Sequence, residues 1–355
     1  MQVTTIGLDL AKHIFQVHAV DETGKVAIRK RLRRSEVLPF FAGLRPCLIG
    51  MEACATSHHW ARELIKLGYT VRLMPPAYVK AYVKRGKTDA ADAEAICEAV
   101  TRPSMRFVPV KSAEKQSVSM LHRVRALLIR QRTMLVNALR GHLAEFGIIV
   151  AQGISRIREL IQLLTDESAD AVLPPLARRA LAPLVDRLLD LQPRIRALEA
   201  ELLAWHQQSQ ESRRLETIPG VGFITATAIA ATVTDPSHFR SGREFAAWLG
   251  LIPRPNSSGG KERLGRISTM GDGYLRTLLV VGATAVIRYA RTKTAADTAW
   301  VNSLLTRKPV RLVSVALANK TARIAWRCWR RGKSTGLPCL LLEHWPGLTS
   351  SVWEG

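Results

Sequence analysis

Short apolar runs alternate with amphipathic stretches over the first part of the chain. Three runs rich in β-branched and aliphatic residues predict three consecutive strands: TTIGLDLA, IFQVHAVD and KVAIRKRLR. Then follow a short helix around EVLPFFAGL, a strand at PCLIGMEA, an amphipathic helix at HHWARELIKLG and a strand at YTVRLMPP. A strand meander followed by strand–helix–strand units indicates an α/β domain with a mixed sheet over residues 1–111.

The middle of the chain has a helical pattern. Apolar positions recur near helical spacing over residues 112–147 and again over residues 176–209. Two long helices of this kind predict an antiparallel coiled-coil arm over residues 112–213, and the Pro174–Pro175 region and Pro183 are expected to interrupt it. The alternative is a plain helical core.

Residues 214–355 predict a mainly α-helical domain with two unusual segments. The first is IPGVG before a helix of small residues, which is similar to a helix-hairpin-helix. Gly220 and Gly222 would there present backbone N–H groups to a DNA phosphate, although Pro-Gly turns before helices are common. The second is GLIPRPNSSGGKERLGRIS, in which Ser257 and Ser258 precede two glycines and a group of cations. On residue types alone, this is a loop that contacts phosphate through its backbone and hydroxyls.

Charge narrows the class of partner. The chain of 355 residues has 52 Lys and Arg against 29 Asp and Glu, a net charge of +23 and a pI near 10.6, so a polyanion, by default nucleic acid, is expected. A hydrophobic content of 47% argues against a mostly disordered protein. Candidate nucleic-acid-binding residues are Lys87, Arg123, Arg130, Gly220, Gly222, Lys261, Arg263, Arg266 and Arg327.

Targeting signals are not recognisable. The N-terminal apolar stretch contains an acid and no cleavage pattern, and no uncharged apolar run reaches the length of a membrane span. The five cysteines are scattered without a CxxC pair, which favours a reducing compartment. We therefore expect a cytoplasmic protein with no membrane partner.

Four carboxylates stand out by position. Asp9 lies inside an apolar strand and Glu52 at the end of another, where burial is costly without compensation. Asp89 and Asp92 are three residues apart at a helix start and share a face. If these elements converge, the four acids would repel one another unless a divalent cation, Mg²⁺ or alternatively Mn²⁺, lies between them. Salt bridges with nearby Lys and Arg are the alternative for each acid.

These motifs together resemble a known family. The strand-borne GLDLAK, the strand-end MEA, the KTDAADA helix and the MEACATSHHWA form are similar to insertion-sequence transposases of the IS one-ten family, one-one-one-one subgroup, also called bridge recombinases. Many relatives have EATG where this chain has Glu52-Ala53-Cys54-Ala55, which leaves the glutamate intact.

The resemblance implies a fold and a chemistry. It implies an RNase H/RuvC-like N-terminal domain whose four acids bind metal, and a C-terminal domain whose serine directly before glycine, Ser258, forms a covalent link to DNA, with Ser257 as the fallback. It also implies a structured guide RNA, a homo-oligomer (dimer or tetramer) and a site whose halves meet across subunits.

The predicted function is that of a transposase that cuts and rejoins DNA through a phosphoserine intermediate assisted by Mg²⁺. Two alternatives stay open. A RuvC-like junction resolvase would use only the four acids and release free ends, and a packaging protein would use neither the acids nor the serine.

Overall fold

The computed structural model divides the chain into two compact units. One unit is Met1–Lys115 with Val233–Asp235, and the other is Gln116–Thr232 with Pro236–Gly355. The residues that the structure describes are 2–83, 88–153, 156–165, 173–256, 263–292 and 299–331. The predicted boundary between residues 213 and 214, which would separate the arm from the C-terminal domain, falls inside the second unit.

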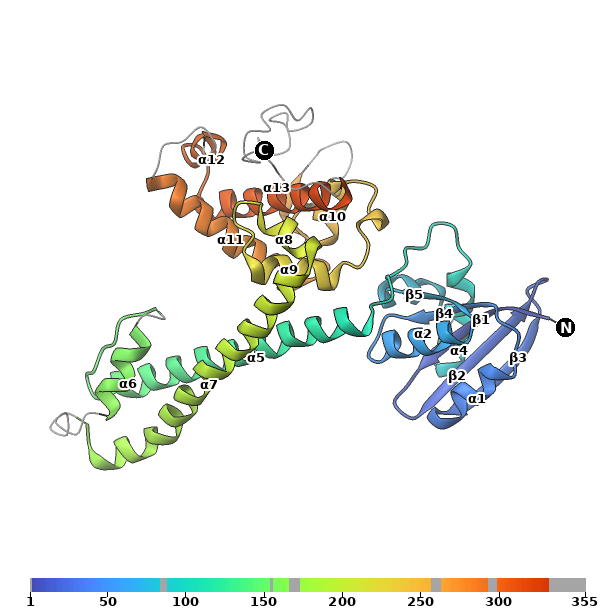
Figure 1. Cartoon of the computed structure of the whole chain (residues 1–355), viewed down its shortest axis with the longest axis horizontal. Coiled ribbons are helices and arrows are strands. Elements are labelled where there is room, and N and C mark those ends of the chain that lie inside the picture. Colours follow the sequence, from blue (N-terminus) through green and yellow to red (C-terminus); the bar gives the residue numbers. More distant parts are fainter. Residues whose placement is uncertain are drawn as a thin grey trace. The chain divides into compact units, whose positions relative to one another are not determined.

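A five-stranded mixed sheet forms the centre of the first unit (Figure 1). The strand order is β3-β2-β1-β4-β5, antiparallel from β3 to β1 and parallel from β1 to β5. The strands are β1 (Val3–Leu10), β2 (Ile14–Asp21), β3 (Val26–Arg33), β4 (Leu48–Glu52) and β5 (Thr70–Met74). The predicted meander followed by parallel units is confirmed.

Period-2 alternation assigns side chains to the two faces of this sheet. Ile6 and Leu8 of β1 and Ile49 and Met51 of β4 are fully buried in one core with residues of the helices α1 and α2. The intervening residues of β1 and β4 face the other side, where α4 packs on β1, β2 and β4. The helices of this unit are α1 (Val37–Ala42), α2 (Ser57–Lys66), α3 (Pro76–Val79) and α4 (Asp89–Val100).

Two glycines allow α4 to lie directly on the sheet. A Cβ at Gly7 of β1 would lie 2.1 Å from the carbonyl oxygen of Ala93 and 2.5 Å from the amide nitrogen of Cys97. A Cβ at Gly50 of β4 would lie 2.7 Å from Cβ of Val100. Because real Cβ atoms do not approach so closely, any other residue at Gly7 would push α4 off the sheet.

Two long antiparallel helices form the arm of the second unit, α5 (Ala113–Ala144) and α7 (Pro175–Gln208). The short helix α6 (Ile157–Thr165) packs where α5 ends and α7 begins. Arg125 contacts Glu199 at 2.6 Å, and Arg132, seven residues further along α5, donates to Gln192 at 2.9 Å, seven residues earlier on α7. These two contacts confirm that the pair is antiparallel.

The predicted interruption at Pro183 is wrong. Both Pro183 and Pro193 lie inside a continuous α7. Proline removes one backbone hydrogen bond from a helix, but the flanking Leu181, Val185 and Leu188 are buried in the arm core. The burial of these side chains holds the helix together across the missing hydrogen bond.

The remainder of the second unit is mostly helical, with one two-stranded hairpin. The elements are α8 (Gln210–Glu216), α9 (Phe223–Thr232), α10 (Gly242–Trp248), β6 (Pro253–Pro255), β7 (Leu264–Ile267), α11 (Gly273–Thr292), α12 (Ala299–Leu305) and α13 (Val310–Arg331). Within the part of the chain that the structure describes, no helix combines the length and apolarity needed to cross a membrane.

A buried histidine joins the arm to these helices. His122 of α5 is 3% exposed, and its ring nitrogens lie 3.1 Å from the Tyr274 hydroxyl and 3.1 Å from the Thr227 hydroxyl. Burial, assisted by the nearby Arg125 charge, lowers the pKa of His122 from 6.5 to about 4. The folded protein therefore holds this imidazole in its neutral form.

We expect this histidine to make the second unit sensitive to acid. Because the unfolded chain binds a proton near pH 6.5 and the folded chain near pH 4, the stabilisation is complete above pH 6.5 and is lost as the pH falls toward 4. The free energy of unfolding should fall by about 2 kcal/mol between pH 7 and pH 5. Urea melts of the full chain at both pH values measure the change. His122→Gln should remove this component, whereas a matched change at the exposed His142 should leave it.

Candidate functional site

Asp9 and Glu52 lie at the same end of two neighbouring parallel strands. Leu8 of β1 pairs with Met51 of β4, so the next residue on each strand places Asp9 beside Glu52. Both are half-buried. By alternation with the core-facing Leu8 and Met51, both carboxylates point to the face of the sheet that α4 covers. The sequence prediction that these two acids meet at one end of the sheet is consistent with this register.

The charges of both carboxylates affect the pKa of the Cys54 thiol. Partial desolvation raises its pKa first, and the negative charges of Glu52 and Asp9 raise it further. One atom is therefore close enough to interact with both acids. A cation at this point would be attracted by the same two charges.

Asp89 and Asp92 begin α4. Thr88 caps the helix by accepting a hydrogen bond from the Ala91 amide at 3.2 Å, and the two acids occupy the first turn. Asp89 is exposed and Asp92 is half-buried. Both continue, toward the helix start, the rows of α4 that are buried, since Asp89 lies four residues before Ala93 and Asp92 lies four residues before Ile96. Acids here also favour the positive end of the helix.

The donor set fits a hard divalent cation in kind, because carboxylate oxygens are the ligands that Mg²⁺ and Mn²⁺ prefer. Among the described residues, which include all four acids, no group of three or more His, Cys, Asp or Glu side chains is placed to hold a metal ion. The structure thus brings Asp9 and Glu52 together and leaves Asp89 and Asp92 outside a common cluster with them.

The serine segment belongs to a hairpin whose base is well defined. Strands β6 and β7 pair antiparallel, and the amide of Asn256 donates to the carbonyl of Arg263 at 2.7 Å. Ser257, Ser258 and Lys261 lie between these two residues, outside the described part of the chain. The described residues on either side of this segment form an antiparallel strand pair, and the role of Ser257 and Ser258 stays a prediction.

Residues that the sequence analysis did not select fix this hairpin base. Arg276 of α11 donates to the carbonyls of Leu249 and Met270 at 2.8 and 2.9 Å. Arg254 donates to the carbonyl of Ser268 at 2.7 Å, and Asn319 of α13 donates to that of Leu251 at 3.1 Å. No sequence pattern identifies these side chains, because they bind backbone carbonyls, which every residue has.

The two glycines of the IPGVG turn have different surroundings. Gly220 has φ of +81°, and a Cβ there would lie 3.0 Å from the carbonyl oxygen of Gly282 in α11, so it has a packing reason to be glycine. Gly222 is exposed just before α9, and a Cβ there would meet nothing within 4 Å. Gly222 therefore has the open surroundings that a phosphate contact requires, whereas α11 fills the space beside Gly220.

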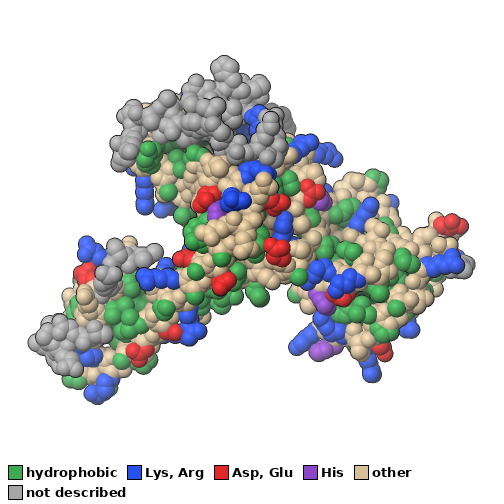
Figure 2. Space-filling view, viewed as in Figure 1, with side chains coloured by type: hydrophobic (Ala, Val, Ile, Leu, Met, Phe, Trp, Pro, Cys, Tyr) green, Lys and Arg blue, Asp and Glu red, His purple; other side chains and the backbone are tan. Residues whose placement is uncertain are grey.

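The predicted cationic contacts have varied exposure. Arg123 and Arg130, seven residues apart on α5, are exposed, as are Arg263 and Arg266 of the hairpin. Arg327 of α13 is half-buried. Figure 2 shows Lys and Arg side chains spread over the visible faces, with acidic and apolar ones between them. Lys87 and Lys261 lie outside the described residues.

Comparison with known proteins identifies what this arrangement is similar to. A family described as "Transposase" matches residues 6–148, and one described as "Transposase IS116/IS110/IS902 family" matches residues 212–298. The chain is 50% identical over 339 residues to a probable family 20 transposase of Pseudomonas aeruginosa, covering 94% of this chain and 100% of that protein. It is 41% identical to the transposase for insertion sequence element IS1328 of Yersinia enterocolitica (91% and 96% covered) and 39% identical to that for IS1111A of Coxiella burnetii (91% and 89%).

Proposed function

The chain belongs to the IS116/IS110/IS902 transposase family, whose members cut and rejoin DNA, and from this premise we propose that it works through a covalent link between Ser258 and DNA. The Ser258 hydroxyl oxygen would attack a phosphodiester, forming an oxygen–phosphorus bond to the serine. The bond to one sugar oxygen breaks, and that oxygen takes the proton. A DNA hydroxyl then attacks the phosphoserine, restoring the serine and joining DNA.

The observation that supports metal-assisted chemistry in this transposase chain is the arrangement of its carboxylates. Asp9 and Glu52 lie side by side at a sheet end, under a helix that begins with Asp89 and Asp92. We propose that Asp9 and Glu52 hold Mg²⁺, with Mn²⁺ as the alternative, in a RuvC-like domain. Asp89 and Asp92 lie outside their cluster in this structure and would complete the site when the ion binds. Such an ion supplies charge neutralisation at the scissile phosphate and favours ionisation of a hydroxyl.

The hairpin supports the serine step in two ways. The segment that leads into β6 is tied to α11 and α13, because Arg276 and Asn319 donate to the carbonyls of Leu249 and Leu251. Arg263 and Arg266 are exposed beside the loop and would offset the charge of an approaching phosphate. Serine is a weak nucleophile by itself, which is why the step needs the activation that the acidic site would bring.

We further propose that a structured RNA from the element guides the enzyme. A net charge of +23 provides affinity for nucleic-acid backbones without regard to sequence. A protein whose target is chosen by base pairing needs large positive surfaces and few base-reading motifs. The sequence fits that description.

The test is to incubate the full chain and the RNA encoded beside its reading frame with DNA carrying both element ends, in Mg²⁺, and to separate the products on a denaturing gel. A labelled DNA that migrates with the protein after denaturation, together with rejoined DNA, supports the proposal. Free cleaved ends without any protein-linked DNA would favour the resolvase alternative. Omission of the RNA tests the guide separately from the chemistry.

An exposed apolar stripe on the arm supports assembly into a homo-oligomer. Met120, Val124, Leu127 and Met134 of α5 are 58%, 40%, 42% and 63% exposed. Their spacings of four, three and seven residues place them along one line of the helix, as in a coiled-coil seam. Hydrophobic side chains also reach the surface of the arm in Figure 2.

We expect Val124→Lys combined with Leu127→Lys to lower the mass of the protein in solution, as measured by light scattering during size-exclusion chromatography. Two charges in a helix seam should weaken the association at least about tenfold, because each would be desolvated without a partner. Asn137→Lys, an exposed change elsewhere on α5, is the matched control. An unchanged mass for the double variant would exclude this stripe as the interface.

A further inference from the structure

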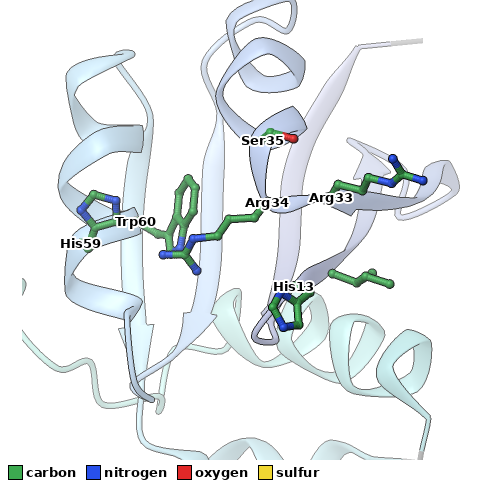
Figure 3. Close-up of a pocket in the computed structure, with 7 residues that line it drawn as sticks. His13, Arg33, Arg34, Ser35, His59 and Trp60 are labelled. Atoms are coloured by element: carbon green, nitrogen blue, oxygen red, sulfur yellow. The ribbon is translucent and has the colours of Figure 1, made fainter.

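A basic pocket of about 720 Å³ opens at the end of the sheet in the first unit. It lies where β2 begins and β3 ends, next to the first turn of α2 and the short 3₁₀ turn η1 (Arg34–Glu36). Its polar and aromatic lining residues are His13, Arg33, Arg34, Ser35, His59 and Trp60 (Figure 3). None of these side chains is acidic.

Arg34 is held in place inside the pocket. Its guanidinium lies 5.1 Å from the centre of the Trp60 ring and 6.0 Å from that of Phe15. Figure 3 shows this side chain extending toward Trp60, while Arg33 points away. A guanidinium that is already ordered over aromatic rings loses little freedom on binding, and its planar donors match two oxygens of a phosphate.

Trp60 contributes an independent sign of a missing ligand. The residue is 4% exposed, and its indole N–H is buried without a hydrogen-bond partner among the described residues. An orphaned buried donor costs free energy until an acceptor reaches it. An oxygen that enters with a shift of the Arg34 side chain would supply that acceptor.

The position of the pocket relates it to the carboxylates. β1 ends just after Asp9, and β2 begins at Ile14 beside the pocket, so both features lie at the same end of the sheet. Arg29, Arg31 and Arg33 alternate along the edge strand β3 on the α4 face and lead to this end. These three arginines lie on the face of the sheet opposite the Trp60 side of the pocket, and only Arg33 reaches the pocket lining, so cations flank this end of the sheet on both faces. Cations on both faces suit an extended polyanion better than a single small anion.

We propose that this pocket binds a phosphodiester of the nucleic acid at the same end of the sheet as Asp9 and Glu52. The proposal rests on the proposed function only in taking DNA or RNA as the ligand, and it does not depend on the serine. DNA and RNA share the phosphate chemistry, so either could occupy the pocket.

The experiment measures binding of the full chain to two labelled probes of one sequence, a single-stranded DNA and a single-stranded RNA, over a range of salt. Arg34→Ala should weaken binding about tenfold and reduce the slope of log K against log salt by about one. Arg45→Ala removes an equally exposed arginine outside the pocket and should change affinity about twofold or less. A loss with one probe only would assign the pocket to that nucleic acid.

A second pair of variants guards against loss of folding. Ser35→Asp places a negative charge in the pocket without removing the Arg34 packing, and Ser104→Asp places one on an exposed turn of the same unit. Only Ser35→Asp should weaken binding about tenfold, with thermal unfolding unchanged in both. Equal losses for the pocket and control variants would overturn the proposal. The serine chemistry is read out by the protein-linked adduct and the pocket by equilibrium binding, so failure of the serine proposal is separable from failure here.

Discussion

Ser258→Ala is expected to abolish the protein-linked DNA on a denaturing gel. Removal of a nucleophile that forms a covalent intermediate costs at least about a thousandfold in rate, because the oxygen that forms the bond to phosphorus is lost. Binding to DNA should fall about fivefold at most, since one neutral hydroxyl contributes about 1 kcal/mol. Gel analysis of the adduct and equilibrium binding of the same DNA, measured in parallel, separate the two effects.

Ser257→Ala is the matched control for that result. It removes the neighbouring hydroxyl from the same loop and should leave most of the adduct. If Ser257→Ala removes the adduct and Ser258→Ala does not, the nucleophile is the fallback residue and the rest of the proposal stands. An adduct that persists in both single variants and in the double variant would eliminate serine chemistry altogether.

Asp9→Asn and Glu52→Gln are each expected to slow DNA cleavage at least about a hundredfold at saturating DNA. The amides keep the shape of the side chains but lose the charge that would hold a divalent cation. Affinity for DNA should stay the same or rise slightly, because one negative charge near the phosphates has gone. Glu22→Gln, an equivalent change at an exposed glutamate of the same unit, should have no effect on the rate.

A second measurement does not depend on activity. Mg²⁺ should raise the melting temperature of the unmodified chain more than that of Asp9→Asn, because a ligand that binds only the folded state stabilises it. An equal shift in both proteins would place the bound ion elsewhere. Full cleavage activity in both Asp9→Asn and Glu52→Gln would refute the metal proposal.

Strand positions in the first unit were predictable because β2 and β3 alternate, while β1 and β4 are short, continuous apolar runs typical of buried strands. The register that places Leu8 opposite Met51 came from the structure, because residue types do not specify which positions of two parallel strands pair. The helix at Asp89 was predictable from its cap and acidic first turn. Pro183 misled the prediction, because local propensity does not include the tertiary packing that keeps α7 continuous.

The pocket and the hairpin base could not be predicted from sequence. Arg34 meets Trp60 and Phe15 only because η1, α2 and β2 come together at one sheet end. Arg276 and Asn319 reach carbonyls that a sequence does not distinguish from any others. The metal-site candidates were recognisable as acids on apolar elements. The separation of Asp89 and Asp92 from Asp9 and Glu52 in the structure was not predictable, because residue types carry no distances.

The contact between Gly7 and α4 has a consequence for protein engineering. β1 and α4 are separated by about eighty residues of chain, yet their surfaces are complementary down to the backbone atoms that meet at Gly7. Chimeras between related transposases that take β1 from one parent and α4 from another would join surfaces that were not selected together. Crossover points should therefore fall outside residues 3–100, so that both pieces are inherited from one parent.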